Sequence, residues 1–184
     1  MSRIDELADQ FERHIATPWQ RNLAGAQRII FVVYPKEDER RLRTKLKEFE
    51  HRTRAAGHGW GEVDFTNLFP LWMAAEEYRE EYFKHPEDLM LKYDSEFAES
   101  CAAHLAGALV AEEVNDDTVL AVYGVAGIYG FTRLHFILQK IESHVRGRLV
   151  VFFPGAYDQN AYRLLDARDG WNYLATPITG LTNQ

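Results

Sequence analysis

The chain has 184 residues, 46% of them hydrophobic and 13% aromatic, which is enough apolar surface for one sizeable core. Its formal net charge of -7 opposes attraction to a phosphate backbone and argues against direct, sequence-independent binding of nucleic acid. The single cysteine, Cys101, excludes an intramolecular disulfide, the N-terminus lacks the features of a signal peptide, and no apolar run reaches the ~20 residues that span a bilayer. We therefore expect one cytoplasmic domain over residues 1–184 that has no membrane partner.

Strand and helix patterns alternate along the first third of the chain. Ser2 is placed to cap a first helix that ends before Pro18. Its apolar residues recur at steps of three and four: Ile4, Leu7, Phe11 and Ile15. Residues 28–34 form a continuous apolar run, which predicts a strand buried on both faces. A helix follows to about residue 57, and residues 61–66 are typical of a shorter strand.

The same alternation continues in the rest of the chain. We expect a long helix from Pro86 to about Glu113, a buried strand over 118–124, and a strand over 148–153 that Pro154 breaks. A further helix is predicted by an apolar stripe between the two strands: Phe131, Leu134, Leu138, Ile141 and Val145. The pattern predicts an α/β fold with three layers, a mostly parallel sheet of about five strands and helices on both faces. It resembles a degenerate nucleotide-binding fold of the P-loop or Rossmann-like type.

A glycine-rich segment lies where nucleotide-binding folds place a phosphate loop, between a buried strand and a helix. Gly127, Gly130 and Thr132 are its candidate nucleotide-binding residues. Phe131, however, stands where a phosphate loop carries its lysine, so no charge meets the terminal phosphates. The favoured interpretation is a structural turn with Phe131 in the core.

The polar segment after residue 155 is a second candidate site, because ligands bind beyond the carboxyl ends of parallel strands. Its charged and amide side chains are Asp158, Asn160, Arg163, Asp166, Arg168 and Asp169. Ion pairs and Asx-turn bonds among these residues are the favoured alternative. As a partner-binding surface, the segment is represented by Asp158, Asn160 and Arg163.

Residues 67–83 contain more aromatic side chains than one helical stripe can bury. Trp72, Tyr78 and Tyr82 are therefore candidate partner-binding residues, because aromatic side chains are enriched at interface centres. Packing of the same residues in an ordinary core is an equally good explanation.

The remaining reactive residue types give no catalytic assignment. The seven histidines form no His-Glu-x-x-His pair, and Cys101 falls on an apolar helix stripe, where a small core residue is expected. We predict no catalytic residue, no metal site and no cofactor.

Three segments together resemble the BrxB family of bacteriophage-exclusion (BREX) systems. They are residues 31–40 (FVVYPKEDER), 55–60 (AAGHGW) and 152–173, which begins FFPG and ends RDGWNY. The resemblance implies a cytoplasmic component of a phage-defence operon, encoded beside a PglZ-type alkaline-phosphatase-like protein, a methyltransferase and ATPases. It implies a non-catalytic adaptor that binds the PglZ-type protein and other BREX components. The alternative is a nucleotide-sensing protein or an enzyme with its site at the C-terminal edge of the sheet.

Overall fold

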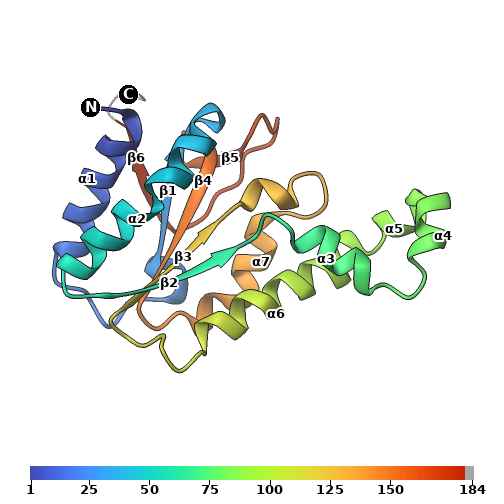
Figure 1. The fold of residues 1–184 in the computed structure, drawn as a ribbon, viewed down its shortest axis with the longest axis horizontal. Helices are drawn as coiled ribbons and strands as arrows, with labels where there is room; N and C mark the ends of the chain where they lie inside the picture. Colours follow the sequence, from blue (N-terminus) through green and yellow to red (C-terminus); the bar gives the residue numbers. More distant parts are fainter. Residues whose placement is uncertain (181–184) are drawn as a thin grey trace.

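The computed structural model describes residues 1–180 of the chain (Figure 1). These residues form seven α-helices: α1 (Arg3–Ala16), α2 (Glu39–Ala55), α3 (Leu68–Ala75), α4 (Arg79–Lys84), α5 (Pro86–Met90), α6 (Ala98–Leu109) and α7 (Leu134–Ile141). They also form six strands: β1 (Ile29–Tyr34), β2 (Gly59–Asp64), β3 (Thr118–Tyr123), β4 (Arg148–Asp158), β5 (Ala161–Leu164) and β6 (Thr176–Thr179). None of the helices in this part of the chain has an apolar stretch long enough to cross a membrane.

The strands form one mostly parallel sheet in the order β2-β3-β4-β1-β6. All pairs along this path are parallel, and β5 pairs in antiparallel fashion with the C-terminal residues of β4, 155–158. The predicted α/β fold with a mostly parallel sheet is confirmed, with six strands in place of about five. β5 and β6 have four residues each, which is too short for a periodic pattern to reveal them.

Successive residues of the central strands face two separate apolar layers. Phe31 and Val151 face a cluster that includes α6 and α7, whereas Val32 and Val150 face a cluster that includes α1 and α2. Figure 1 shows these helix pairs on opposite sides of the sheet. The helices therefore cover both faces, as the continuous apolar strands predicted.

The first helix forms as its sequence predicts. The Ser2 hydroxyl accepts a hydrogen bond from the backbone N–H of Asp5 at 3.3 Å, and the Asp5 carboxylate accepts one from the Ser2 N–H at 2.9 Å. This reciprocal capping box satisfies two N–H groups at the helix start. The four predicted apolar side chains are all buried on the sheet.

The prediction of one long helix from Pro86 to Glu113 is wrong. The segment contains α5, a π-helical turn over Tyr93–Phe97, and then α6. The buried apolar side chains that recur every four residues all lie at or after this break: Phe97, Cys101, Leu105 and Leu109. Before the break, Leu89 is buried but belongs to neither core cluster, and Met90 and Leu91 are exposed, so packing on the sheet does not hold α5 in line with α6.

Two further boundaries differ from the prediction. Pro154 does not end β4, because it occupies the last position paired with β1 and the strand then changes partner to β5. A side chain at Gly155 would lie 1.9 Å from the Arg163 carbonyl oxygen, so only glycine permits this close pairing. The helix predicted from Phe131 begins only at Leu134, which leaves Phe131 in the preceding loop.

Candidate functional site

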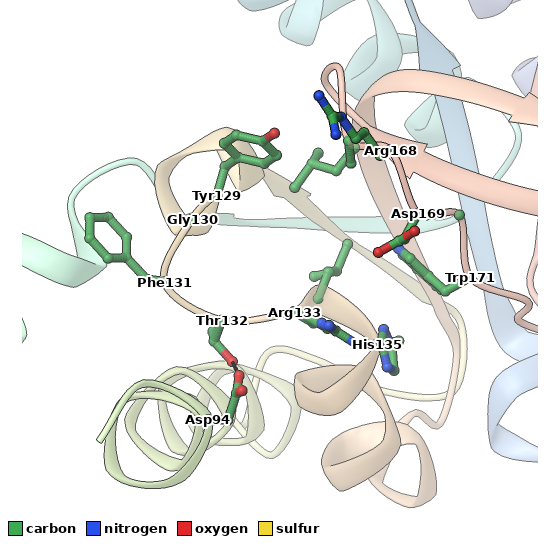
Figure 2. Close-up of a pocket in the computed structure, with 14 residues that line it drawn as sticks. Asp94, Tyr129, Gly130, Phe131, Thr132, Arg133, His135, Arg168, Asp169 and Trp171 are labelled. Atoms are coloured by element: carbon green, nitrogen blue, oxygen red, sulfur yellow. Dashed lines mark hydrogen bonds between the residues drawn. The ribbon is translucent and has the colours of Figure 1, made fainter. Parts of the chain in front are cut away.

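A pocket of about 430 Å³ lies beyond the carboxyl end of β3 (Figure 2). One wall comes from residues 129–135, which include the end of the β3–α7 connection and the first turn of α7. The opposite wall comes from residues 164–171, which follow the β4–β5 hairpin, and Asp94 contributes from the π-helical turn. The pocket therefore occupies the edge of the sheet where open α/β folds bind ligands.

The glycine-rich segment is only partly in this pocket. Gly130, in the left-handed region at φ 82°, and Thr132 line it. Gly127 packs elsewhere: a side chain there would meet the Thr66 carbonyl oxygen at 2.6 Å. The structure thus brings together two of the three predicted nucleotide-binding residues. Gly127, which has no side chain, instead permits close packing against the turn that follows β2.

Thr132 is bonded to an acidic residue. Its buried hydroxyl donates a hydrogen bond of 2.9 Å to the Asp94 carboxylate, as Figure 2 shows. A phosphate group next to Thr132 would meet the negative charge of Asp94, whereas a phosphate loop offers a lysine at the adjacent position. This geometry disfavours binding of a nucleotide's terminal phosphates at this point.

His135 faces the pocket from the first turn of α7 (Figure 2). Its ring lies 5.2 Å from the Trp171 ring and 4.4 Å from the Phe136 ring, measured between centroids. Burial and the neighbouring Arg133 lower the pKa of His135, while Asp94 opposes them. Its buried Nδ1 makes no hydrogen bond within residues 1–180, so one polar atom of the ring is left unpaired beside the pocket.

Three exposed charged side chains surround the opening: Arg133, Arg168 and Asp169. Arg133 lies over the Phe136 ring, 5.8 Å from its centroid. Cys101 does not line this pocket; it is 1% exposed in α6, and burial raises the pKa of its thiol to about 12. The expectation that Cys101 is a core residue is confirmed. Within residues 1–180 no cluster of three metal-ligating side chains is present.

The polar C-terminal segment divides between two places. Arg168 and Asp169 line the pocket, whereas Asp158 and Asn160 lie at the turn of the β4–β5 hairpin and Arg163 lies exposed on β5. Within residues 1–180 no ion pair joins two of the six polar residues of this segment, and the bonds that two of them form go to other residues. The Tyr157 hydroxyl donates to Asn160 Oδ1 at 3.1 Å, and Lys36 forms an ion pair with Asp166.

The three candidate aromatic residues of segment 67–83 also lie in different environments. Trp72 is half-buried, with its ring 5.3 Å from that of Phe97, so it belongs largely to the core. Tyr78 is 61% exposed. Tyr82 is half-buried beneath the Lys92 ammonium group, which lies 5.0 Å from its ring centroid.

Tyr78 and Tyr82 belong to a projecting segment, residues 76–92, that we call the helical arm. It includes α4 and α5, which Figure 1 shows extending away from the sheet beyond α3. Lys92 pairs with Glu76 at 3.3 Å and thereby ties the two ends of the arm together.

Asp94, Arg133 and His135 line the pocket, and the sequence does not single them out. Arg133 and His135 directly follow the glycine-rich segment, and this proximity was the one available signal. Asp94 lies 38 positions before its partner Thr132, so no local pattern connects them.

The family model described as BREX protein BrxB matches residues 68–178. The chain belongs to the BrxB family. The match extends from α3 into β6 and includes the helical arm and both walls of the pocket. No curated protein and no solved structure matches the chain. BrxB membership implies a role in BREX phage defence alongside other BREX components.

The position of Phe131 gives a stability prediction. Its half-buried ring stacks on Phe69 with 3.6 Å between centroids and an interplanar angle of 5°. Phe131→Lys is expected to lower the free energy of unfolding by about 1 to 3 kcal/mol, because the stacking is lost and an ammonium group is partly desolvated. Urea denaturation measures the loss. An unchanged unfolding midpoint, or an ATPase created by the lysine, would contradict this account of the loop.

Proposed function

We propose that this BrxB protein is a non-catalytic adaptor that binds the PglZ-type protein of its BREX system through the helical arm. The observation that supports the proposal is the gathering of exposed apolar side chains on a projecting segment. Of the nine large hydrophobic residues that are exposed within residues 1–180, four lie on the arm: Tyr78, Phe83, Met90 and Leu91. Apolar side chains gathered in this way mark interaction surfaces.

The charge of the arm indicates what kind of surface would receive it. Residues 76–92 contain six acidic and three basic residues. An acidic rim around exposed aromatic and aliphatic side chains fits an apolar groove bordered by lysine or arginine. The same charge disfavours nucleic acid as the arm's partner.

The absence of a phosphate-loop lysine supports the non-catalytic part of the proposal. Phe131 stacks on Phe69 at that position, and Asp94 holds the Thr132 hydroxyl. Neither arrangement supplies the positive charge that phosphoryl transfer requires. The chain is therefore expected to act by holding its partner.

Co-purification with the PglZ-type protein of the same operon tests the proposal. We expect a complex that survives size-exclusion chromatography at micromolar concentrations, and no ATP or GTP turnover by the BrxB protein alone. Failure of the two proteins to associate would refute the adaptor function. A rise in melting temperature with ATP or GTP would instead favour the nucleotide-sensing alternative, because a ligand of the folded state stabilises it.

A further inference from the structure

Arg148 is a buried cation at the amino-terminal edge of the sheet, opposite the pocket of Figure 2. It is the first residue of β4 and is 8% exposed. Its guanidinium donates to the Gly147 carbonyl oxygen at 3.0 Å and to the Gln20 carbonyl oxygen at 3.1 Å. Within residues 1–180 it forms no salt bridge.

A buried charge without an opposite charge is unfavourable, and native proteins rarely keep one without a reason. Burial and the nearby Arg28 both lower the pKa of Arg148, and no carboxylate acts in the opposite direction to raise it. The guanidinium still remains charged, because arginine does not lose its proton in proteins. The two carbonyl oxygens fix its direction but leave its charge unmatched.

Arg148 lines a pocket of about 390 Å³ that no acidic residue lines. Its polar lining comes from His14, Thr17, Gln20, Gln27 and Thr176, in addition to Arg148. The Trp19 ring forms an apolar wall, with the guanidinium 4.8 Å from its centroid. The pocket therefore combines one fixed cation, several neutral hydrogen-bonding groups and an aromatic surface.

An adjoining pocket of about 220 Å³ shares Arg148 and does contain acidic residues, Asp116 and Asp117. Each of them already has a cation of its own. Asp116 pairs with Arg146 and Asp117 pairs with Arg21, both at 3.8 Å. These aspartates therefore do not neutralise Arg148.

We propose that the pocket at Arg148 binds a small organic oxyanion, a carboxylate or a phosphate ester, with the guanidinium as its charged contact. A planar guanidinium can bind either group through two parallel N–H bonds. The pocket is larger than a lone phosphate ion, so there is room for an organic portion beside Trp19. The site lies away from the helical arm and does not depend on the adaptor function.

Melting temperatures measured with sodium phosphate and with sodium malonate, at ionic strength matched by sodium chloride, test the proposal. Gln27→Glu is the informative variant. Gln27 Oε1 accepts a hydrogen bond from the Ala24 N–H at 3.1 Å, which a glutamate can keep while adding a negative charge to the pocket. Gln139→Glu is the matched control, because Gln139 is exposed on α7 and does not line this pocket.

We expect the wild type and Gln139→Glu to gain roughly 3 to 6 °C at an anion concentration about tenfold above Kd. Gln27→Glu should lose this gain, and so should Arg148→Gln if it folds. General stabilisation by excluded anions is common to all variants, so the difference between them is the result that counts. A response to phosphate alone identifies a phosphate ester, and a response to malonate alone identifies a carboxylate. If Gln27→Glu responds to both anions as the wild type does, the proposal is wrong.

Discussion

Phe31→Ala is expected to lower the free energy of unfolding by about 3 to 5 kcal/mol, the largest stability effect that we predict. Phe31 is fully buried on β1, which lies between β4 and β6 in the sheet. Its ring lies within 4.4 to 6.3 Å of four other aromatic rings: Phe153, Tyr162, Trp171 and Tyr173. Removing it leaves a cavity next to Trp171, which lines the first pocket, so the surrounding rings lose contacts together.

Equilibrium urea denaturation measures this loss, which corresponds to a fall in melting temperature of roughly 6 to 20 °C. Phe83→Ala is the matched control, because it removes the same side chain from a position that is 63% exposed. We expect that variant to stay within about 0.5 kcal/mol of the wild type. Equal losses for the two variants would show that the aromatic cluster around Phe31 does not hold the fold.

The central strands could be predicted because their own residues determine them. β1, β3 and the first half of β4 are buried on both faces, so each is a nearly unbroken apolar run in the sequence. The second half of β4 depends on a different partner, β5, and on the close approach at Gly155. Pairing of this kind is a tertiary contact, and a local pattern at Pro154 predicts a break instead.

The helix patterns were reliable where a helix packs on the sheet. α1 and α6 bury the stripes that the sequence shows. α5 has no such packing, so the helix propensity that suggests continuity into α6 does not decide its direction. The helical arm is therefore both the place where the helix prediction failed and the place where apolar side chains are left exposed.

The sequence indicated where the candidate site lies but not which residues form it. Two sequence segments, around Gly130 and around Arg168, were each assigned to the carboxyl edge of the sheet, and the structure places them on opposite walls of one pocket. Asp94 reaches the same pocket through the break between α5 and α6. Because the sequence predicted an unbroken helix there, nothing indicated that Thr132 would have an acidic partner.

The double variant Tyr78→Ala with Phe83→Ala is expected to weaken binding of the PglZ-type protein by about 30-fold or more. The two side chains are 61% and 63% exposed on the helical arm, so truncation removes contact area without opening the core. An aromatic residue at the centre of an interface commonly contributes about 2 kcal/mol or more, and the loss of one such contribution corresponds to roughly 30-fold in Kd. Isothermal titration calorimetry or surface plasmon resonance measures the change.

Val110→Ala is the control for this binding experiment. Val110 is 65% exposed at the end of α6, outside the arm, so its truncation should leave Kd within about twofold. Trp72→Ala and Arg163→Ala separate the other surfaces. Trp72 packs on Phe97, so Trp72→Ala is expected to destabilise the fold before it weakens binding. Arg163 lies on β5, so Arg163→Ala is expected to weaken binding only if the interface extends to the β4–β5 hairpin.

The arm's six acidic residues add a second expected result, because association steered by opposite charges slows as salt rises. The association rate should fall between low and physiological ionic strength for the wild type and for the double variant alike. The dissociation rate should rise only in the double variant, since the aromatic contacts act after encounter. A double variant that remains folded and binds with the affinity of the wild type would place the interface elsewhere and remove the arm from the proposed function.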